Sequence, residues 1–144
     1  MASGITFKVE ENLGFSLKEK ASIKNWISKI LKQEGKTPGS ISYFFCTDEY
    51  LLHINRQFLQ HDFYTDIITF DYSEKTKVEG EIFISIDRVK ENAHSFKQPF
   101  ERELMRTIIH GILHLCGYTD KTAANKKTMR AKEDAAIKLS LNLE

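Results

Sequence analysis

The chain has 144 residues, enough for one domain with a hydrophobic core of its own. Apolar residues make up 41% and charged residues 28%, the composition of an ordinary globular protein. The formal net charge of +1 gives no overall field that would indicate a nucleic-acid or membrane partner, although a local basic groove is compatible with it. The N-terminus has no leader-like pattern and no apolar run is long enough to span a bilayer, so we expect a cytoplasmic protein.

The first half of the chain predicts two strands and two helices. Residues 5–9 alternate apolar and polar side chains, which is typical of a strand. The run Ser16-Leu17-Lys18-Glu19 has the form of a capping box and predicts a helix from there through Leu31. We expect a turn at 35–39 and a strand at 40–46, and then a second helix, capped by Thr47 or Asp48 and reaching Phe58.

The second half predicts a strand hairpin followed by helices. Residues 66–72 and 81–86 read as strands joined by a charged turn at 73–80. Asp87 is expected to cap a helix, Pro99 to open a long helix, and a last helix to run from about 122 to 141. Because helices and strands do not alternate strictly, the pattern favours an α+β fold with a small mixed sheet flanked by helices, in one domain over 1–144.

The long helix carries the most informative pattern of the chain, H-x3-H-x5-D. His110 and His114 are four residues apart and therefore lie on one face of a helix. Gly117 can end that helix in a left-handed turn, which would bring Asp120 back as a third ligand. These residues would supply three ligand atoms, two nitrogens and one oxygen. A catalytic zinc typically has three protein ligands and keeps its fourth position open for water.

A structural interpretation of the two histidines competes with this one. The helix around them is apolar on most of its circumference, and a histidine in such a helix is usually a hydrogen-bonded core residue. Two histidines on one face must both find polar partners where few are available, and a shared cation satisfies both. We therefore favour a single metal ion, zinc or another divalent metal, held by His110, His114 and Asp120.

Such a site indicates a hydrolase, because zinc lowers the pKa of a bound water from about 16 towards about 7. The spacing also overlays the metzincin protease pattern H-E-x-x-H-x-x-G-x-x-H, with Asp120 in the third place. A protease needs a glutamate after its first histidine as general base, and Gly111 occupies that position. Loss of a general base typically costs about two to four orders of magnitude in rate, so the protease is the second choice.

Other polar residues are weaker candidates. Thr65 and Thr69 are predicted to share one face of a strand as phosphate donors, or simply to be strand formers. Arg106 precedes His110 by one helical turn, as Glu103 does by two, and can neutralise a phosphate or pair with a carboxylate. The basic residues of the last helix either attract RNA or simply form a solvent-exposed face, and the nearby acids Glu133 and Asp134 reduce their positive charge. These basic residues are Lys121, Lys126, Lys127, Arg130 and Lys132. Three histidines without ligand-like spacing are expected at the surface, His53, His61 and His94, and two cysteines are expected to be buried without a disulfide partner, Cys46 and Cys116.

Three segments in order resemble the bacterial YbeY family of metal-dependent endoribonucleases. The signature H-G-x-L-H-L-x-G-Y-D-H is similar to residues 110–120, with Gly111, Leu113 and Leu115 in register. A second segment, L-N-x-x-Y-R-x-x-D-x-P-T-D-V-L-S-F, is similar to residues 54–70, and the strand G-D-I-x-I-S is similar to residues 80–85. The resemblance covers nearly the whole chain.

The resemblance implies a small mixed sheet with a metal-bearing helix at its centre, and a single-strand-specific ribonuclease that acts in maturation of 16S ribosomal RNA and ribosome biogenesis. Two positions depart from the family pattern. The third histidine of the signature falls on Asp120, which can still bind a metal, and the arginine of the second segment falls on Leu59. Leucine cannot replace a bidentate phosphate ligand, and Arg56, one turn earlier, is either its substitute or a surface charge. A third class of function, a ribosome-assembly factor with a structural metal, stays open beside the nuclease and the protease.

Overall fold

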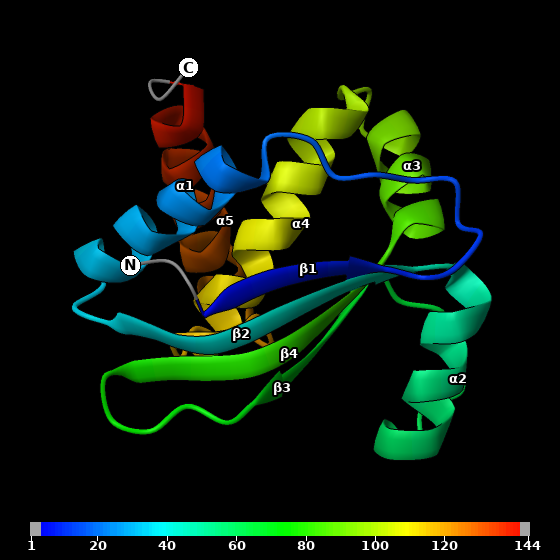
Figure 1. Cartoon of the computed structure of the whole chain (residues 1–144), viewed down its shortest axis with the longest axis horizontal. Helices are drawn as coiled ribbons and strands as arrows, with labels where there is room; N and C mark the ends of the chain where they lie inside the picture. The colour runs from blue at the N-terminus through cyan, green and yellow to red at the C-terminus, as the bar shows by residue number, and fades with distance from the viewer. Residues whose placement is uncertain (1–3, 142–144) are drawn as a thin grey trace.

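The computed structural model describes residues 4–141, which form four strands and five helices. In chain order these are β1 (Ile5–Val9), α1 (Lys20–Gln33), β2 (Thr37–Cys46), α2 (Asp48–Leu59), β3 (Ile67–Asp71), β4 (Lys77–Ser85), α3 (Ile86–Ser95), α4 (Phe100–Leu115) and α5 (Ala123–Leu141). The strands form one sheet in the order β1-β2-β4-β3 (Figure 1). β1, β2 and β4 are parallel, and β3 pairs antiparallel with β4, which confirms the α+β class and the predicted hairpin.

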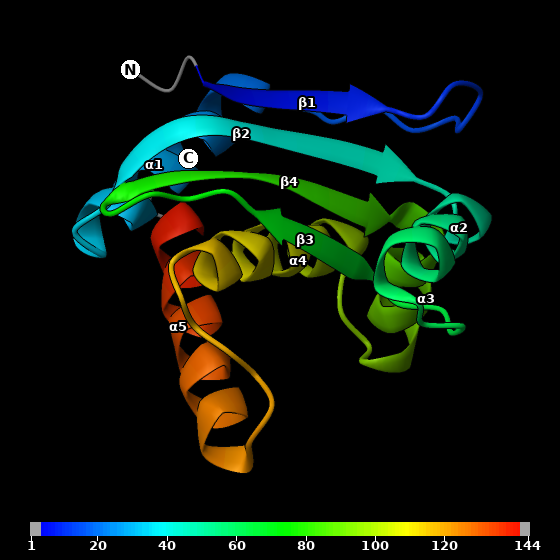
Figure 2. The same ribbon diagram turned by 90° about the horizontal axis from the view of Figure 1, so that it is seen from below.

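The helix α4 runs along one face of the sheet and carries the candidate site (Figure 2). Its residues Ile108, Ile109 and Ile112 are fully buried in the main core, and burial of such a side chain contributes roughly 1.5–3 kcal/mol. The helix comes close to the strands at Gly111, where an added Cβ would lie 3.0 Å from side-chain atoms of Ile82. A glycine at this position therefore brings the histidine-bearing turns of α4 up to the sheet.

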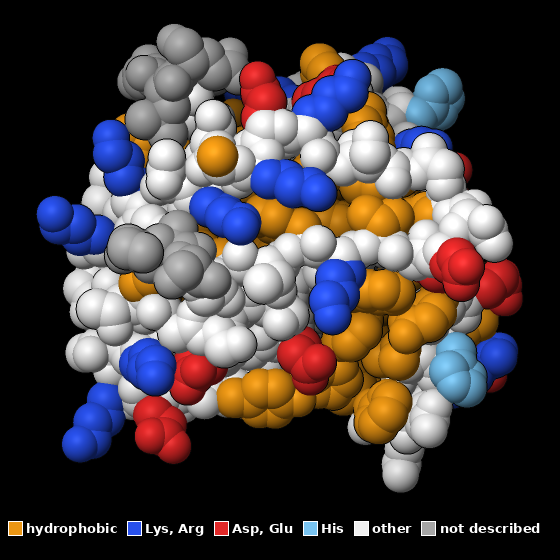
Figure 3. All heavy atoms as spheres, viewed as in Figure 1, with side chains coloured by type: hydrophobic (Ala, Val, Ile, Leu, Met, Phe, Trp, Pro, Cys, Tyr) orange, Lys and Arg blue, Asp and Glu red, His pale blue; other side chains and the backbone are white. Residues whose placement is uncertain are grey.

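The opposite face of the sheet is covered only in part, by α2. Leu51 and Ile54 of this helix pack on Ile68 and on partly buried aromatic rings of the strands. Figure 3 shows the resulting apolar surface beside α2. Side chains at its margin such as Phe58 and Tyr72 are more than half exposed. The candidate site lies on the other side of the sheet, with α4.

The predicted capping box at Ser16 is wrong, since α1 begins at Lys20. The residue before the helix, Glu19, has φ 56° and makes no side-chain cap. The segment before α1 is irregular because Leu17 enters the core and Phe15 packs against the ring of Phe45. Burial of these two side chains outweighs the small gain from a cap.

Three other boundaries differ from the prediction. β4 begins at Lys77, within the predicted turn at 73–80, because Lys77 and Val78 pair with the start of β2. β2 already begins at Thr37, so the predicted turn at 35–39 ends early; Pro38 is tolerated because the register with β4 shifts just after it. The cap of α3 is Ser85, whose hydroxyl accepts from the backbone N–H of Arg88 at 3.1 Å. Asp87 instead accepts from the backbone N–H of Asp48 at 2.9 Å, so its carboxylate serves the start of α2.

Candidate metal centre

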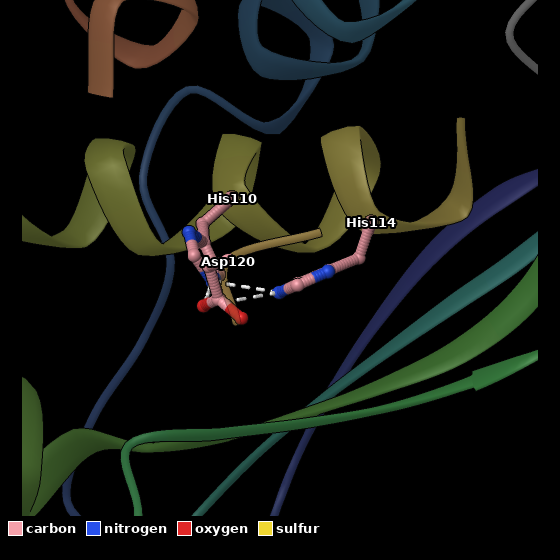
Figure 4. Close-up of side chains that lie close together, drawn as sticks. All are labelled: His110, His114 and Asp120. Atoms are coloured by element: carbon pink, nitrogen blue, oxygen red, sulfur yellow. Dashed lines mark hydrogen bonds and ion pairs between the residues drawn. The ribbon is translucent and has the colours of Figure 1, made fainter. Parts of the chain in front are cut away.

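The structure brings His110, His114 and Asp120 together at the end of α4. The two Nε2 atoms are 2.9 Å apart, and one Asp120 carboxylate oxygen (Oδ2) lies 3.4 Å from Nε2 of His110 and 3.6 Å from Nε2 of His114 (Figure 4). The three side chains are partly exposed, at 20%, 24% and 42% respectively. The arrangement is thus half-buried and open to solvent on one side.

The turn after α4 has the geometry predicted from Gly117. This glycine has φ 103°, which an L side chain adopts only with strain. Its N–H donates to the carbonyl of His114 at 3.0 Å, and the N–H of Tyr118 donates to the carbonyl of Leu113 at 3.0 Å, the two bonds of a Schellman motif. The chain therefore reverses at Gly117, and Asp120 arrives beside the two imidazoles.

Side chains from two other helices hold this turn. The hydroxyl of Tyr118 donates to Oε1 of Glu34 at 2.6 Å, and Lys132 of α5 lies 3.0 Å from the other oxygen of Glu34. Thr119 accepts a hydrogen bond from Asn125 at 2.8 Å. These contacts fix the segment that presents Asp120 between the end of α1 and the start of α5.

The second nitrogen of each imidazole has an acceptor as its partner. Nδ1 of His114 lies 3.0 Å from the carbonyl oxygen of Tyr118, and Nδ1 of His110 lies 2.5 Å from a carboxylate oxygen of Glu133. Since a carbonyl and an ionised carboxylate only accept, these partners assign the proton to Nδ1 in both neutral rings. The two Nε2 atoms are then bare lone pairs that point at each other and at the carboxylate of Asp120.

Three converging lone pairs repel one another, and a cation between them removes that repulsion. In tetrahedral zinc coordination with bonds of about 2.0–2.1 Å, neighbouring ligand atoms are about 3.3 Å apart. The observed separations of 2.9, 3.4 and 3.6 Å lie around that value. The donor set therefore fits a single divalent cation, and neutral imidazoles with a carboxylate suit zinc and its neighbours in the transition series.

Glu133 of α5 connects the site to a buried charge network. Its side chain is 7% exposed, and its second oxygen lies 2.8 Å from Nη1 of Arg106, whose Nη2 lies 2.7 Å from Asp134. Burial tends to lower the pKa of His110, but the hydrogen bond to Glu133 and its charge outweigh this, and the pKa is raised. Burial lowers the pKa of His114, and so does the charge that His110 carries whenever it is protonated.

A fourth protein ligand is absent from the part of the chain that the structure describes. Within residues 4–141, His110, His114 and Asp120 form the one group of His, Cys, Asp or Glu whose ligand atoms all lie within 4.8 Å of one another. Three ligands and an open side are the arrangement of a catalytic ion, whereas structural zinc sites are closed by four protein ligands.

The two threonines predicted as phosphate donors are not part of this centre. Thr69 pairs with Ile82 in the sheet and so faces α4, whereas Thr65 precedes β3 and its hydroxyl contacts the carbonyl of Ile67 at 3.4 Å. Thr65 is therefore not on the strand, contrary to the prediction that both threonines share one strand face. Their contact with phosphate stays a prediction.

The arginine candidates are both in ion pairs. Arg56 is exposed on α2 and pairs with Asp62, and Leu59 is 38% exposed on the last turn of the same helix. Arg106 commits both terminal nitrogens to Glu133 and Asp134, which favours its pairing interpretation over direct phosphate contact. The sequence analysis did not predict the contact of Glu133 with His110. Glu133 is four residues from both Met129 and Ile137, which are buried, and this spacing indicates an acid on the apolar face of the last helix.

The other residues weighed from the sequence behave as expected, with one exception. His53, His61 and His94 are exposed, and neither cysteine forms a disulfide. Cys46 is buried, while Cys116 is only partly buried, which corrects the expectation for that residue. None of the helices among the described residues is long and apolar enough to cross a membrane.

The α+β fold and the candidate His-His-Asp metal centre at the end of a buried helix indicate a hydrolase. The family model described as Endoribonuclease YbeY matches residues 8–140, and the chain belongs to this family of hydrolases. Endoribonuclease YbeY of Flavobacterium psychrophilum is 51% identical over 94% of this chain and 95% of its own, and that of Cytophaga hutchinsonii is 52% identical over 92% and 94%. The solution structure of TM1509 from Thermotoga maritima superposes with a TM-score of 0.67 at 28% identity, covering 96% of this chain and 89% of that one.

Proposed function

We propose that the protein is a metal-dependent endoribonuclease that cuts single-stranded ribosomal RNA, acting on 16S RNA during ribosome biogenesis in the cytoplasm. The observation that carries the proposal is the convergence of His110, His114 and Asp120 with one side open, in a chain of the YbeY family. The names of the relatives supply the substrate class, RNA. We assign one zinc ion to the centre, with other divalent metals as alternatives.

Different residues would bind the metal, orient its ligands and contact the substrate. His110, His114 and Asp120 would hold the ion, which when bound acts as a Lewis acid toward a phosphate oxygen and lowers the pKa of a coordinated water. Glu133 keeps the Nδ1 proton of His110 in place, so that Nε2 of this ring faces inward, and the Tyr118 carbonyl does the same for His114. Thr69, Thr65 and Arg56 are the proposed substrate-side groups, of which Thr69 faces α4. Arg106, a further candidate from the sequence, acts instead through its ion pair with Glu133.

The protease alternative receives no support from the fold. The position at which a metzincin carries its glutamate is Gly111, where even a Cβ would lie 3.0 Å from side-chain atoms of Ile82, so that a larger side chain would require the strand residues to shift. The structural-metal alternative predicts four protein ligands, and three are found among the described residues. Both stay as outcomes of the test.

The test compares two substrates with one preparation. Zinc-reconstituted protein is incubated with structured RNA containing single-stranded loops and, separately, with casein. We expect RNA cleavage that is lost on chelation and in His114→Ala, with casein intact. Cleavage of casein and not RNA would make it a protease. No cleavage of either, with a melting temperature that collapses on chelation, would make the metal structural.

A further inference from the structure

A cavity of about 350 Å³ opens at the metal centre, and two of the three proposed ligands, His110 and Asp120, are part of its lining. Its walls come from α3, α4 and α5, which Figure 2 shows grouped on the α4 side of the sheet. The volume is within the range of roughly 300–1,000 Å³ typical of small-molecule sites. We call it the α3–α5 cavity; its lining residues include Asp66, Phe96, Glu103, Lys126, Met129 and Arg130.

Glu103 is the unusual group in this cavity. It is only 6% exposed, yet among the described residues no side chain or backbone group makes a hydrogen bond or ion pair with its carboxylate. Thr107 bonds the backbone carbonyl of Glu103, and Arg106 uses both terminal nitrogens on Glu133 and Asp134. Its oxygens are not sealed from solvent, since Ser28 Oγ is the one buried side-chain polar atom without a partner among the described residues; they face the water of the cavity, where a ligand carrying N–H groups can pair with them.

A second acidic side chain, that of Asp66, is close to Glu103 in this cavity. Asp66 lines the same cavity, and its one side-chain partner among the described residues is Asn92, at a long 3.4 Å. Among the described residues, one group of three ligand atoms is close enough to hold an ion, and it is the centre at His110. Glu103 and Asp66 do not belong to it. The cavity therefore fits a ligand that donates hydrogen bonds better than a second cation.

The other walls suit a flat aromatic ligand attached to a phosphate chain. Phe96 is 57% exposed, and Met129 is buried against the cavity. Lys126 and Arg130 bring two exposed positive charges to the same cavity. Proteins read single-stranded RNA by stacking splayed bases on such side chains and by hydrogen bonds to their Watson–Crick edges.

We propose that the α3–α5 cavity is a nucleobase subsite in which the Glu103 carboxylate accepts from the ring N–H and the exocyclic amino group of guanine. Both donors lie side by side on one edge of guanine, which matches the two oxygens of a carboxylate. Uracil fits worst, because carbonyl oxygens flank its single N–H. The inference rests on the proposed function and adds a base preference beside the cut.

The first experiment measures binding, which does not depend on cleavage. Guanosine and uridine 5′-monophosphates are titrated into zinc-loaded protein, and NMR gives the dissociation constant of each. Both carry the same phosphate, so a contact of the phosphate with the metal does not affect the ratio of the two dissociation constants. We expect guanosine monophosphate to bind at least tenfold tighter in the wild type, in line with about 1–3 kcal/mol for a bidentate base contact. Equal affinities would overturn the proposal, whether or not any variant folds.

The second experiment uses Glu103→Gln with Glu101→Gln as its matched control, because Glu101 is an exposed acid on the same helix. The cleavage sites of a randomised single-stranded RNA are mapped by sequencing. We expect guanine enrichment at one position beside the cut in the wild type and in Glu101→Gln, and its loss in Glu103→Gln. An unchanged preference in Glu103→Gln would refute the subsite. Absence of any cleavage by the wild type, with guanosine still preferred in binding, would refute the nuclease and leave the subsite standing.

Discussion

The two histidines of the centre are supported in different ways. His114 is held by its own neighbourhood, since its Nδ1 contacts the carbonyl of Tyr118 in the turn that follows the helix. His110 depends on Glu133, which is 23 residues away in sequence and is itself held by Arg106. One half of the site is therefore built by local backbone geometry, and the other half by docking of α5 onto α4.

This difference explains what the sequence could predict. The spacing of the histidines and the glycine at 117 are local signals, and they correctly predicted the helix, the turn and the approach of Asp120. The partner of His110 is a tertiary contact, and no periodicity within α4 indicates it. The same limit applies to Ser16, where a local capping pattern was overridden by burial of Leu17.

The element order and the fold class were also predictable, because the strands carry alternating or β-branched runs and the helices carry apolar stripes. The start of β2 was not, because Thr37 and Pro38 join the sheet only through pairing with β4. The α3–α5 cavity could not be predicted from the sequence, because its walls come from three helices and from the loop that holds Asp66.

The largest expected effect comes from removing one of the two histidines themselves. His110→Ala or His114→Ala should reduce zinc binding by at least a hundredfold, because two remaining ligands hold the ion poorly. Competition with a chromophoric chelator measures the dissociation constant. His53→Ala, an exposed histidine on α2, is the control and should bind zinc as the wild type does. Equal binding in all variants would place the ion elsewhere.

The next effect tests the His110 half alone. Glu133→Ala should weaken zinc affinity by about 10- to 100-fold, the usual cost of losing a group that orients a metal-binding histidine. Asp134→Asn is the matched control, because Asp134 contacts the same arginine but not the imidazole. Long-range nitrogen–proton NMR of the His110 ring should show the proton no longer confined to Nδ1 in Glu133→Ala. Loss of affinity in the control as well would indicate a general effect on α5.

A smaller effect tests the His114 half. Gly117→Ala places a side chain at φ 103° and should lower the free energy of unfolding by about 1–2 kcal/mol, because this backbone conformation is strained for any residue with a Cβ. Gly14→Ala, with φ 72° and open space around it, is the control for a positive-φ glycine outside the contacts that hold the centre. Urea unfolding of the metal-free proteins gives both values. Zinc affinity should fall in the first variant and stay constant in the second.

The smallest effect concerns the anchor of the turn. Burial tends to raise the pKa of Glu34, but hydrogen bonds from Tyr118 and Lys132 lower it below its ordinary value. Its ionised form therefore contributes stability above the unfolded pKa of about 4.5, and this contribution is lost as the pH falls through the lower folded pKa. Glu34→Gln should cost about 0.5–1.5 kcal/mol at pH 7, and the difference from the wild type should shrink in acid. A difference independent of pH would contradict the charged hydrogen bond.

The most direct test of the account is the metal content of the purified protein beside that of Asp120→Ala, both determined by elemental analysis. The geometry of His110, His114 and Asp120 predicts one equivalent of a divalent metal, zinc, in the wild type and little in the variant. A full equivalent in both proteins, or none in a wild type that cleaves RNA, would contradict a centre made by these three residues.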